Sequence, residues 1–156
     1  MVDLTGKRVL ITRPRAQYAE FATRLLEHGA VPLAFPAIAV TGIENTYELD
    51  QAIQTLERYH WLVFTSANGV NAAWKRMIEL DVSQIPSGIK IAAIGPKTAA
   101  ALEERGVQVN FVPDEYIAEA ILPGLGEVKG KRILLLRADI ARPDLTMAIQ
   151  MAGGDA

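Results

Sequence analysis

The sequence predicts an α/β fold: a flavodoxin-like parallel sheet flanked by helices, preceded by a β-α-β piece of a second, similar lobe. Three observations lead to this prediction. Short, almost continuously apolar runs alternate with stretches of helical periodicity, as in parallel sheets that are covered on both faces. Glycine or proline residues lie at the boundaries of these segments. The stretch 7–29 also recurs at 131–153, where Arg13 and Arg137 are followed at the same distance by Gly29 and Gly153.

Predicted strands and helices alternate along the chain. Helical patterns begin at Ala16, after the capping pair Asn45 and Glu48, and after Ser66, whose hydroxyl suits a helix N-cap. Gly29 and Gly106 are placed to end helices. The predicted strands are 9–12, 31–35, 61–64, 90–94, 109–112 and 132–136, and the later helices are 96–105, 116–122 and 143–151.

The weakly periodic, polar stretch 38–45 indicates a linker between two parts of the chain. Residues 1–37 then form the opening β-α-β unit of a first, incomplete lobe. Residues 46–156 form most of a second α/β lobe, for which we expect the last strand to be missing. The second copy of the repeat stops soon after Gly153, so we expect the chain to be the front part of a longer molecule.

Composition narrows the functional classes. Half of the 156 residues are apolar, and the net charge is −2 with both signs mixed, so no basic patch indicates nucleic acid as a partner. The chain has no cysteine, and no apolar run approaches the ~18 residues of a membrane span. The first residues of the sequence lack the charged-then-apolar pattern of a signal peptide. We therefore expect a cytoplasmic protein that has neither a membrane nor a nucleic-acid partner.

Four strand-to-helix segments are candidate ligand sites, because ligands of such sheets bind outside the carboxyl ends of the strands. These segments are 12–15, 65–69, 95–98 and 137–142. Each offers backbone N–H groups at a helix start, and most add a cation, which favours an anionic ligand. Structural roles remain open alternatives: Ser66 as an N-cap, Gly95 in a tight turn, and Arg13 and Arg137 as solvated strand ends.

Reactive side chains are not indicated. The sequence contains no G-x-G-x-x-G after a strand, no P-loop and no G-x-S-x-G elbow. Histidines and carboxylates do not cluster at metal-ligand spacing. We therefore expect no catalytic side chain and no metal, and a site that works by binding and orienting its ligand.

Four segments together resemble the uroporphyrinogen-III synthase family. They are 7–15 (KRVLITRPR), 61–69 (WLVFTSANG), 90–98 (KIAAIGPKT) and 131–137 with the later pair 142–143. The combination of T-R-P-R, F-T-S-A-N-G and I-G-P-K-T carries the resemblance, which covers nearly the whole chain. One departure is Ile117, where the resemblance would place a small hydroxyl residue.

The resemblance implies an enzyme that closes the linear tetrapyrrole hydroxymethylbilane to uroporphyrinogen III, with loss of water and inversion of ring D. It implies no cofactor, and a substrate with many carboxylates held in a cleft between two lobes. The implied substrate-binding residues are Arg13, Arg15, Thr65, Ser66, Asn68, Gly95, Lys97 and Thr98, with Arg137 and Arg142 as weaker candidates.

Two further expectations concern the chain as it stands. If it ends at Ala156, we expect it to bind the tetrapyrrole poorly and not to cyclise it, whereas the full-length protein is expected to be a monomer. An exposed sheet edge would favour self-association of the shorter chain. The alternative function is a non-catalytic, anion-binding α/β regulatory module.

Overall fold

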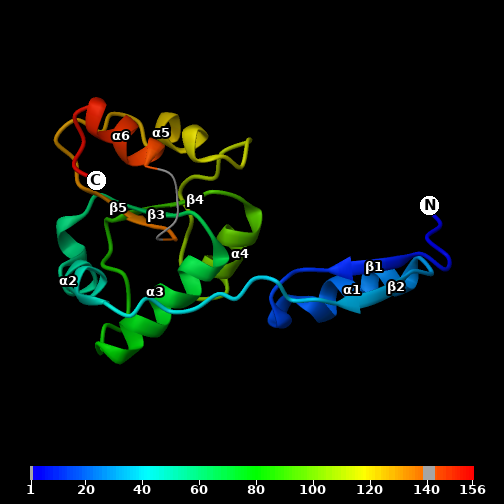
Figure 1. Cartoon of the computed structure of the whole chain (residues 1–156). Helices are drawn as coiled ribbons and strands as arrows, with labels where there is room; N and C mark the ends of the chain where they lie inside the picture. Colours follow the sequence, from blue (N-terminus) through cyan, green and yellow to red (C-terminus); the bar gives the residue numbers. More distant parts are fainter. Residues whose placement is uncertain (1, 139–142) are drawn as a thin grey trace. The chain divides into compact units, whose positions relative to one another are not determined.

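The computed structural model describes residues 2–138 and 143–156 (Figure 1). The chain divides into two compact units, Met1–Glu44 and Asn45–Ala156.

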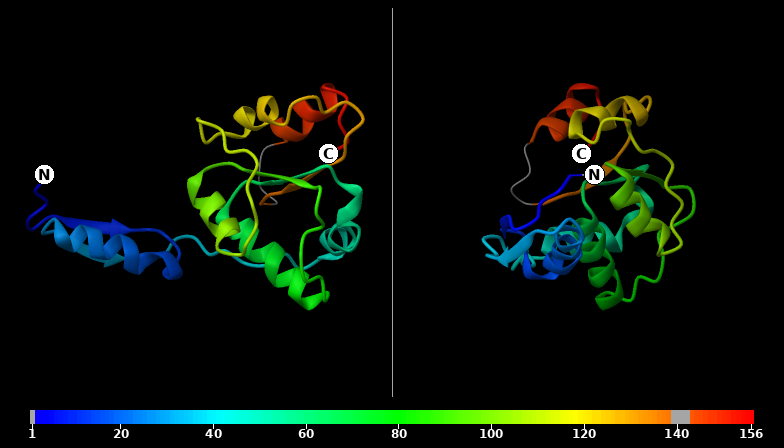
Figure 2. Two further views of the ribbon diagram at one scale, coloured as in Figure 1. Left: turned by 180° about the vertical axis from the view of Figure 1, so that it is seen from behind. Right: turned by 90° about the vertical axis from the view of Figure 1, so that its right-hand side faces the viewer.

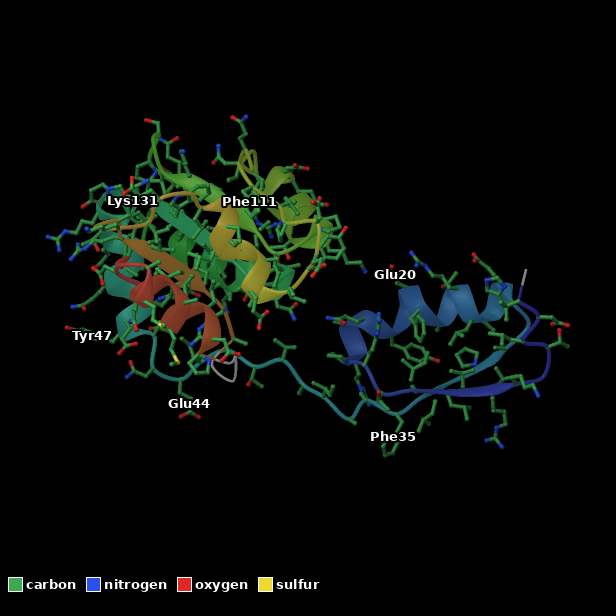
Figure 3. The ribbon with its side chains drawn as sticks, turned by 90° about the horizontal axis from the view of Figure 1, so that it is seen from above. Glu20, Phe35, Glu44, Tyr47, Phe111 and Lys131 are labelled. Carbon is green, nitrogen blue, oxygen red and sulfur yellow. The ribbon has the colours of Figure 1, made fainter. Side chains whose placement is uncertain are left out.

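Unit 1 is a β-α-β motif with one covered face. Its elements are β1 (Arg8–Ile11), the 3-10 helix η1 (Arg15–Gln17), α1 (Tyr18–Glu27) and β2 (Val31–Ala34), and the two strands are parallel. Ile11 of β1 is buried with Ala22 and Leu25 of α1. Leu10 is 56% exposed, and Phe35 points away from α1 (Figure 3). The sheet of unit 1 therefore carries exposed apolar side chains on the face away from α1.

Unit 2 contains a parallel sheet with the strand order β4-β3-β5. The three strands pair in register, with Phe64 of β3 opposite both Ala93 and Leu136. The elements are α2 (Tyr47–Gln54), the 3-10 helix η2 (Leu56–Arg58), β3 (Trp61–Phe64), α3 (Ala67–Glu79), β4 (Lys90–Ala93), α4 (Pro96–Glu103), the 3-10 helix η3 (Ala118–Ala120), α5 (Ile121–Gly124), β5 (Ile133–Leu136) and α6 (Asp144–Met151).

The central strand β3 is buried along its whole length. Leu62 and Phe64 join the apolar cluster formed with α2, α3 and α4. Trp61 and Val63 join the second cluster, formed with α5 and α6. Helices therefore cover both faces of the sheet (Figures 1 and 2). This arrangement explains the continuous apolar strands and confirms the predicted α/β fold with a helix-flanked parallel sheet.

Both edges of this sheet carry single bridges. Phe111 pairs with Ala92 beyond β4, in place of the strand predicted over 109–112. The Asn110 side chain explains the difference, because its Oδ1 accepts the Ile91 N–H at 2.7 Å in place of a backbone carbonyl. Beyond β5, Asp155 pairs in parallel with Arg132, at an edge where we expected no further strand.

The sequence repeat is also a repeat of backbone geometry. The Val31 N–H donates to Lys7 O at 2.8 Å, and the Asp155 N–H donates to Lys131 O at the same distance. Gly29 and Gly153 adopt φ values of 79° and 83° at the helix ends that precede these bonds. Such left-handed backbone favours glycine, which accounts for the matching glycines in the two copies.

An ion pair joins α2 to α3. Arg76 Nη2 donates to Asp50 Oδ2 at 2.6 Å, and a second bond joins Arg76 Nε to Asp50 Oδ1. Thr46 Oγ1 adds a third hydrogen bond to the same carboxylate, at 3.0 Å. The bonds from Arg76 lower the pKa of Asp50, because they favour its charged form.

This lowered pKa makes stability depend on pH. A carboxylate with a depressed folded-state pKa stabilises the fold above its unfolded pKa of about 3.9, and that contribution disappears as the pH falls through the folded value. We expect the free energy of unfolding to decline less on acidification in Asp50→Asn than in the wild type. Urea unfolding at several values between about pH 6 and pH 2 measures this. An equal decline of the free energy of unfolding with falling pH in the two proteins would contradict this expectation.

Candidate anion-binding site

The carboxyl ends of β3, β4 and β5 lie along one rim of unit 2. The Thr65 N–H donates to Leu136 O at 3.2 Å, and the Ile94 N–H donates to Phe64 O at 3.0 Å. These bonds extend the strand pairing by one residue. They place Thr65 at the end of β3 beside the end of β5, with Gly95 just after the end of β4.

The start of α3 forms the first part of this rim. Ser66 caps the helix, and its Oγ accepts the Gly69 N–H at 3.0 Å. Gly69 packs closely, because a Cβ at this position would lie 3.2 Å from Leu136 O. The cap leaves the N–H groups of Ala67 and Asn68, in the first turn, without helical partners. Such groups favour an anion.

The start of α4 forms the second part. Gly95 is its N-cap, Pro96 occupies the first turn, and Lys97 is exposed. Thr98, the third residue predicted here, is only 4% exposed, and its N–H donates to Gly95 O at 3.0 Å. Lys97 therefore offers the cation and the free first-turn N–H, while Thr98 belongs to the packed side of α4.

The remaining predicted cations divide between the two units. Arg137 follows β5 directly and is partly buried, and Arg142 lies outside the described residues. In unit 1, Arg13 and Arg15 line one hollow of about 340 Å³, together with Tyr18, Ala34 and Pro36. The Arg13 guanidinium lies 4.8 Å from the centroid of the Phe21 ring, which supports its position. Unit 1 therefore brings its two predicted arginines together.

A second hollow lies at the opposite, amino end of the sheet in unit 2. Its volume is about 400 Å³, and its lining includes Arg58, Lys90 and Lys131. Among the described residues, no α-helix of at least eight residues begins there, whereas α3 and α4 both begin at the carboxyl rim. Because helix starts supply unpaired N–H groups and positive dipole ends, we regard the carboxyl rim as the stronger anion site.

Tyr116 is a rim residue that the sequence analysis did not single out. A Cβ on Gly95 would lie 3.1 Å from Tyr116 Cγ and 3.2 Å from Cδ1, so the ring packs directly on the glycine. Gly95 and Tyr116 are far apart in the sequence, and the helix predicted over 116–122 does not say which distant residue its first side chain contacts. In the structure Tyr116 precedes η3, which begins at Ala118, so it lies in an irregular segment.

Within the ranges 2–138 and 143–156, no group of three or more histidine, aspartate or glutamate side chains is placed to hold a metal ion. In the same ranges, no helix combines the length and the apolar character that crossing a bilayer requires.

Comparison with known proteins identifies the family of the chain. The family model described as uroporphyrinogen-III synthase HemD matches residues 19–155. The chain belongs to the uroporphyrinogen-III synthase family. The Synechococcus elongatus uroporphyrinogen-III synthase is 32% identical over 152 residues, which are 96% of this chain and 58% of that protein. A putative uroporphyrinogen-III synthase of Methanocaldococcus jannaschii is 33% identical over 122 residues, or 78% of this chain and 48% of that protein.

Solved structures agree on the fold. The uroporphyrinogen-III synthase of Thermus thermophilus superposes with a TM-score of 0.61 at 22% identity, over 96% of this chain and 58% of that one. A mutant of the same enzyme gives a TM-score of 0.69 at 23% identity. The chain therefore shares the fold of these solved structures and spans between 48% and 59% of the length of the relatives named here.

The cap at the start of α3 can be tested apart from ligand binding. Ser66→Ala removes the acceptor of the Gly69 N–H, so we expect the free energy of unfolding to fall by about 1 kcal/mol. The neighbouring Asn68→Ala is the control, because Asn68 is exposed, and we expect a change within about 0.5 kcal/mol. Urea unfolding measures both. Equal effects of the two substitutions would show that the cap does not stabilise α3.

Proposed function

We propose that this chain binds a tetrapyrrole carrying several carboxylates. In the whole protein, it takes part in closing hydroxymethylbilane to uroporphyrinogen III, with loss of water and inversion of ring D. The membership of the chain in the uroporphyrinogen-III synthase family supports the reaction. One observation of geometry supports the ligand class: the starts of α3 and α4 meet on one rim, at the carboxyl ends of paired strands.

The chemistry of the rim suits carboxylates. Amide N–H groups at two helix starts donate hydrogen bonds to carboxylate oxygens, and these bonds are stronger than neutral ones. Lys97 adds a positive charge at the start of α4. In unit 2 we assign Thr65, Ser66, Asn68, Gly95 and Lys97 to this role, with Arg137 beside them.

In unit 1, Arg13 and Arg15 supply a second set of carboxylate contacts, on the hollow that they share. Guanidinium groups bind carboxylates through two parallel hydrogen bonds. A flexible linear substrate with acidic groups at many positions can use separate sets of contacts. Each set then fixes a different part of the substrate.

Catalysis in this proposal comes from positioning. The rim offers hydroxyls, amides and a lysine, and we assign no general acid or base to it. Holding the two reacting ends of one flexible molecule together contributes up to about 7–11 kcal/mol to lowering a barrier in ideal cases. The direction of ring D at closure then follows from how the carboxylates are held.

The reaction is tested by adding hydroxymethylbilane to the whole protein and to buffer alone, then separating the type I and type III isomers. We expect the type III isomer to predominate with protein, whereas spontaneous closure gives type I. Type I alone in both samples would contradict the proposed reaction. Titration of this chain with inorganic phosphate separates the alternative: tighter binding of phosphate than of uroporphyrinogen III favours a general anion-binding module.

The charge at the start of α4 gives a prediction for this chain. Lys97→Ala should weaken the binding of uroporphyrinogen III by about two- to fivefold, as expected when one exposed ion pair is lost. Calorimetric titration under nitrogen measures the affinity. Lys75→Ala is the matched control, since Lys75 is an exposed lysine of α3 paired with Glu79 at 3.9 Å. Equal losses in the two variants would place the ligand elsewhere.

A further inference from the structure

The segment that follows the Phe111 bridge turns back over the carboxyl end of β4. The Ala93 N–H donates to Phe111 O at 3.0 Å, and this bond fixes the start of the segment at the sheet edge. The Phe111 ring packs directly on Gly124, where an added Cβ would lie 2.0 Å from its Cζ. Pro113 is buried, and the Ile117 N–H donates to Glu115 O at 2.9 Å. The position of Tyr116 is therefore set by the backbone on both sides.

Gly95 supports the Tyr116 ring from one side only. The glycine is buried, and its missing side chain leaves the space that Cγ and Cδ1 of the ring approach. Tyr116 nevertheless remains 61% exposed. One part of the ring thus rests on the N-cap residue of α4, and most of its surface faces solvent at the rim that carries the free N–H groups.

A flat, exposed ring beside amide donors fits a particular ligand chemistry. Aromatic rings attract one another in offset-stacked or edge-to-face arrangements, with gains of about 0.5–1.5 kcal/mol beyond the buried area. A pyrrole ring that carries carboxylate side chains offers both an aromatic face for Tyr116 and anions for the starts of α3 and α4. Phosphate or a simple sugar acid offers only the anion.

We propose that Tyr116 is a positioning residue that stacks on one pyrrole ring of the tetrapyrrole, and that Gly95 sets the place of the ring. This inference rests on the proposed function and adds a contact that recognises the pyrrole itself. The carboxylates fix where the ligand is held, and the Tyr116 ring fixes the plane of one of its rings.

The test is a titration of the 156-residue chain with uroporphyrinogen III under nitrogen. Tyr116→Ala should weaken binding by about three- to tenfold, and Tyr116→Phe should recover most of that loss, because the ring rather than the hydroxyl makes the contact. Tyr47→Ala is the matched control, since Tyr47 lies in α2 and is 63% exposed. In the wild type, we expect nuclear Overhauser effects between the ring protons of Tyr116 and the methylene protons of the ligand side chains.

Gly95→Ala tests how the ring is placed. The added Cβ would displace the ring, so affinity should fall, but it should fall no further when Gly95→Ala is combined with Tyr116→Ala. If Gly95→Ala lowers the affinity equally in the wild type and in Tyr116→Ala, Gly95 does not act through the Tyr116 ring.

These experiments distinguish a failure of the proposed function from a failure of the role of Tyr116. If the wild-type chain does not bind uroporphyrinogen III, the proposed function fails for this chain and the stacking role fails with it. If the chain binds the ligand but Tyr116→Ala matches Tyr47→Ala and the Overhauser effects are absent, only the role of Tyr116 is overturned.

Discussion

The in-register parallel pairing of β3 with both neighbours is the constraint on which the rest of unit 2 depends. Phe64 lies opposite both Ala93 and Leu136, so three strands end at the same level. A shift of one residue would move every side chain of β3 to the opposite face. It would also separate the starts of α3 and α4. Leu62 and Phe64 pack in one apolar cluster, and Trp61 and Val63 pack in the other. This packing on two faces sets the register and, through it, the geometry of the candidate site.

The sequence predicts much of this fold because its signals are local. The apolar run of β3, the capping residue Ser66 and the proline at the start of α4 each indicate one element or one boundary. The helix ends at the repeated glycines could be predicted for the same reason, since a left-handed backbone at Gly29 and Gly153 restricts the residue type directly. The strand-to-helix turns that carry most of the candidate site residues could therefore be located before the structure was known.

The rest depends on contacts between distant residues. Asn110 interrupts a predicted strand because its side chain bonds to Ile91, and no local pattern contains that bond. Thr98 follows Lys97 but is buried, because α4 turns that side chain toward the sheet. Tyr116 reaches the rim only because the chain folds back from Phe111. In each case the deciding factor is a tertiary contact, and periodicity does not report such contacts.

In our proposal, the polycarboxylate ligand binds at the carboxyl rim of unit 2, through amide groups at the starts of α3 and α4. The most direct measurement maps amide chemical shifts of the nitrogen-15-labelled chain during titration with uroporphyrinogen III. We predict the largest shifts at the amides of Ala67, Asn68 and Lys97. Shifts concentrated instead at Lys90 and Lys131, on the hollow at the amino end of the sheet, would contradict the account.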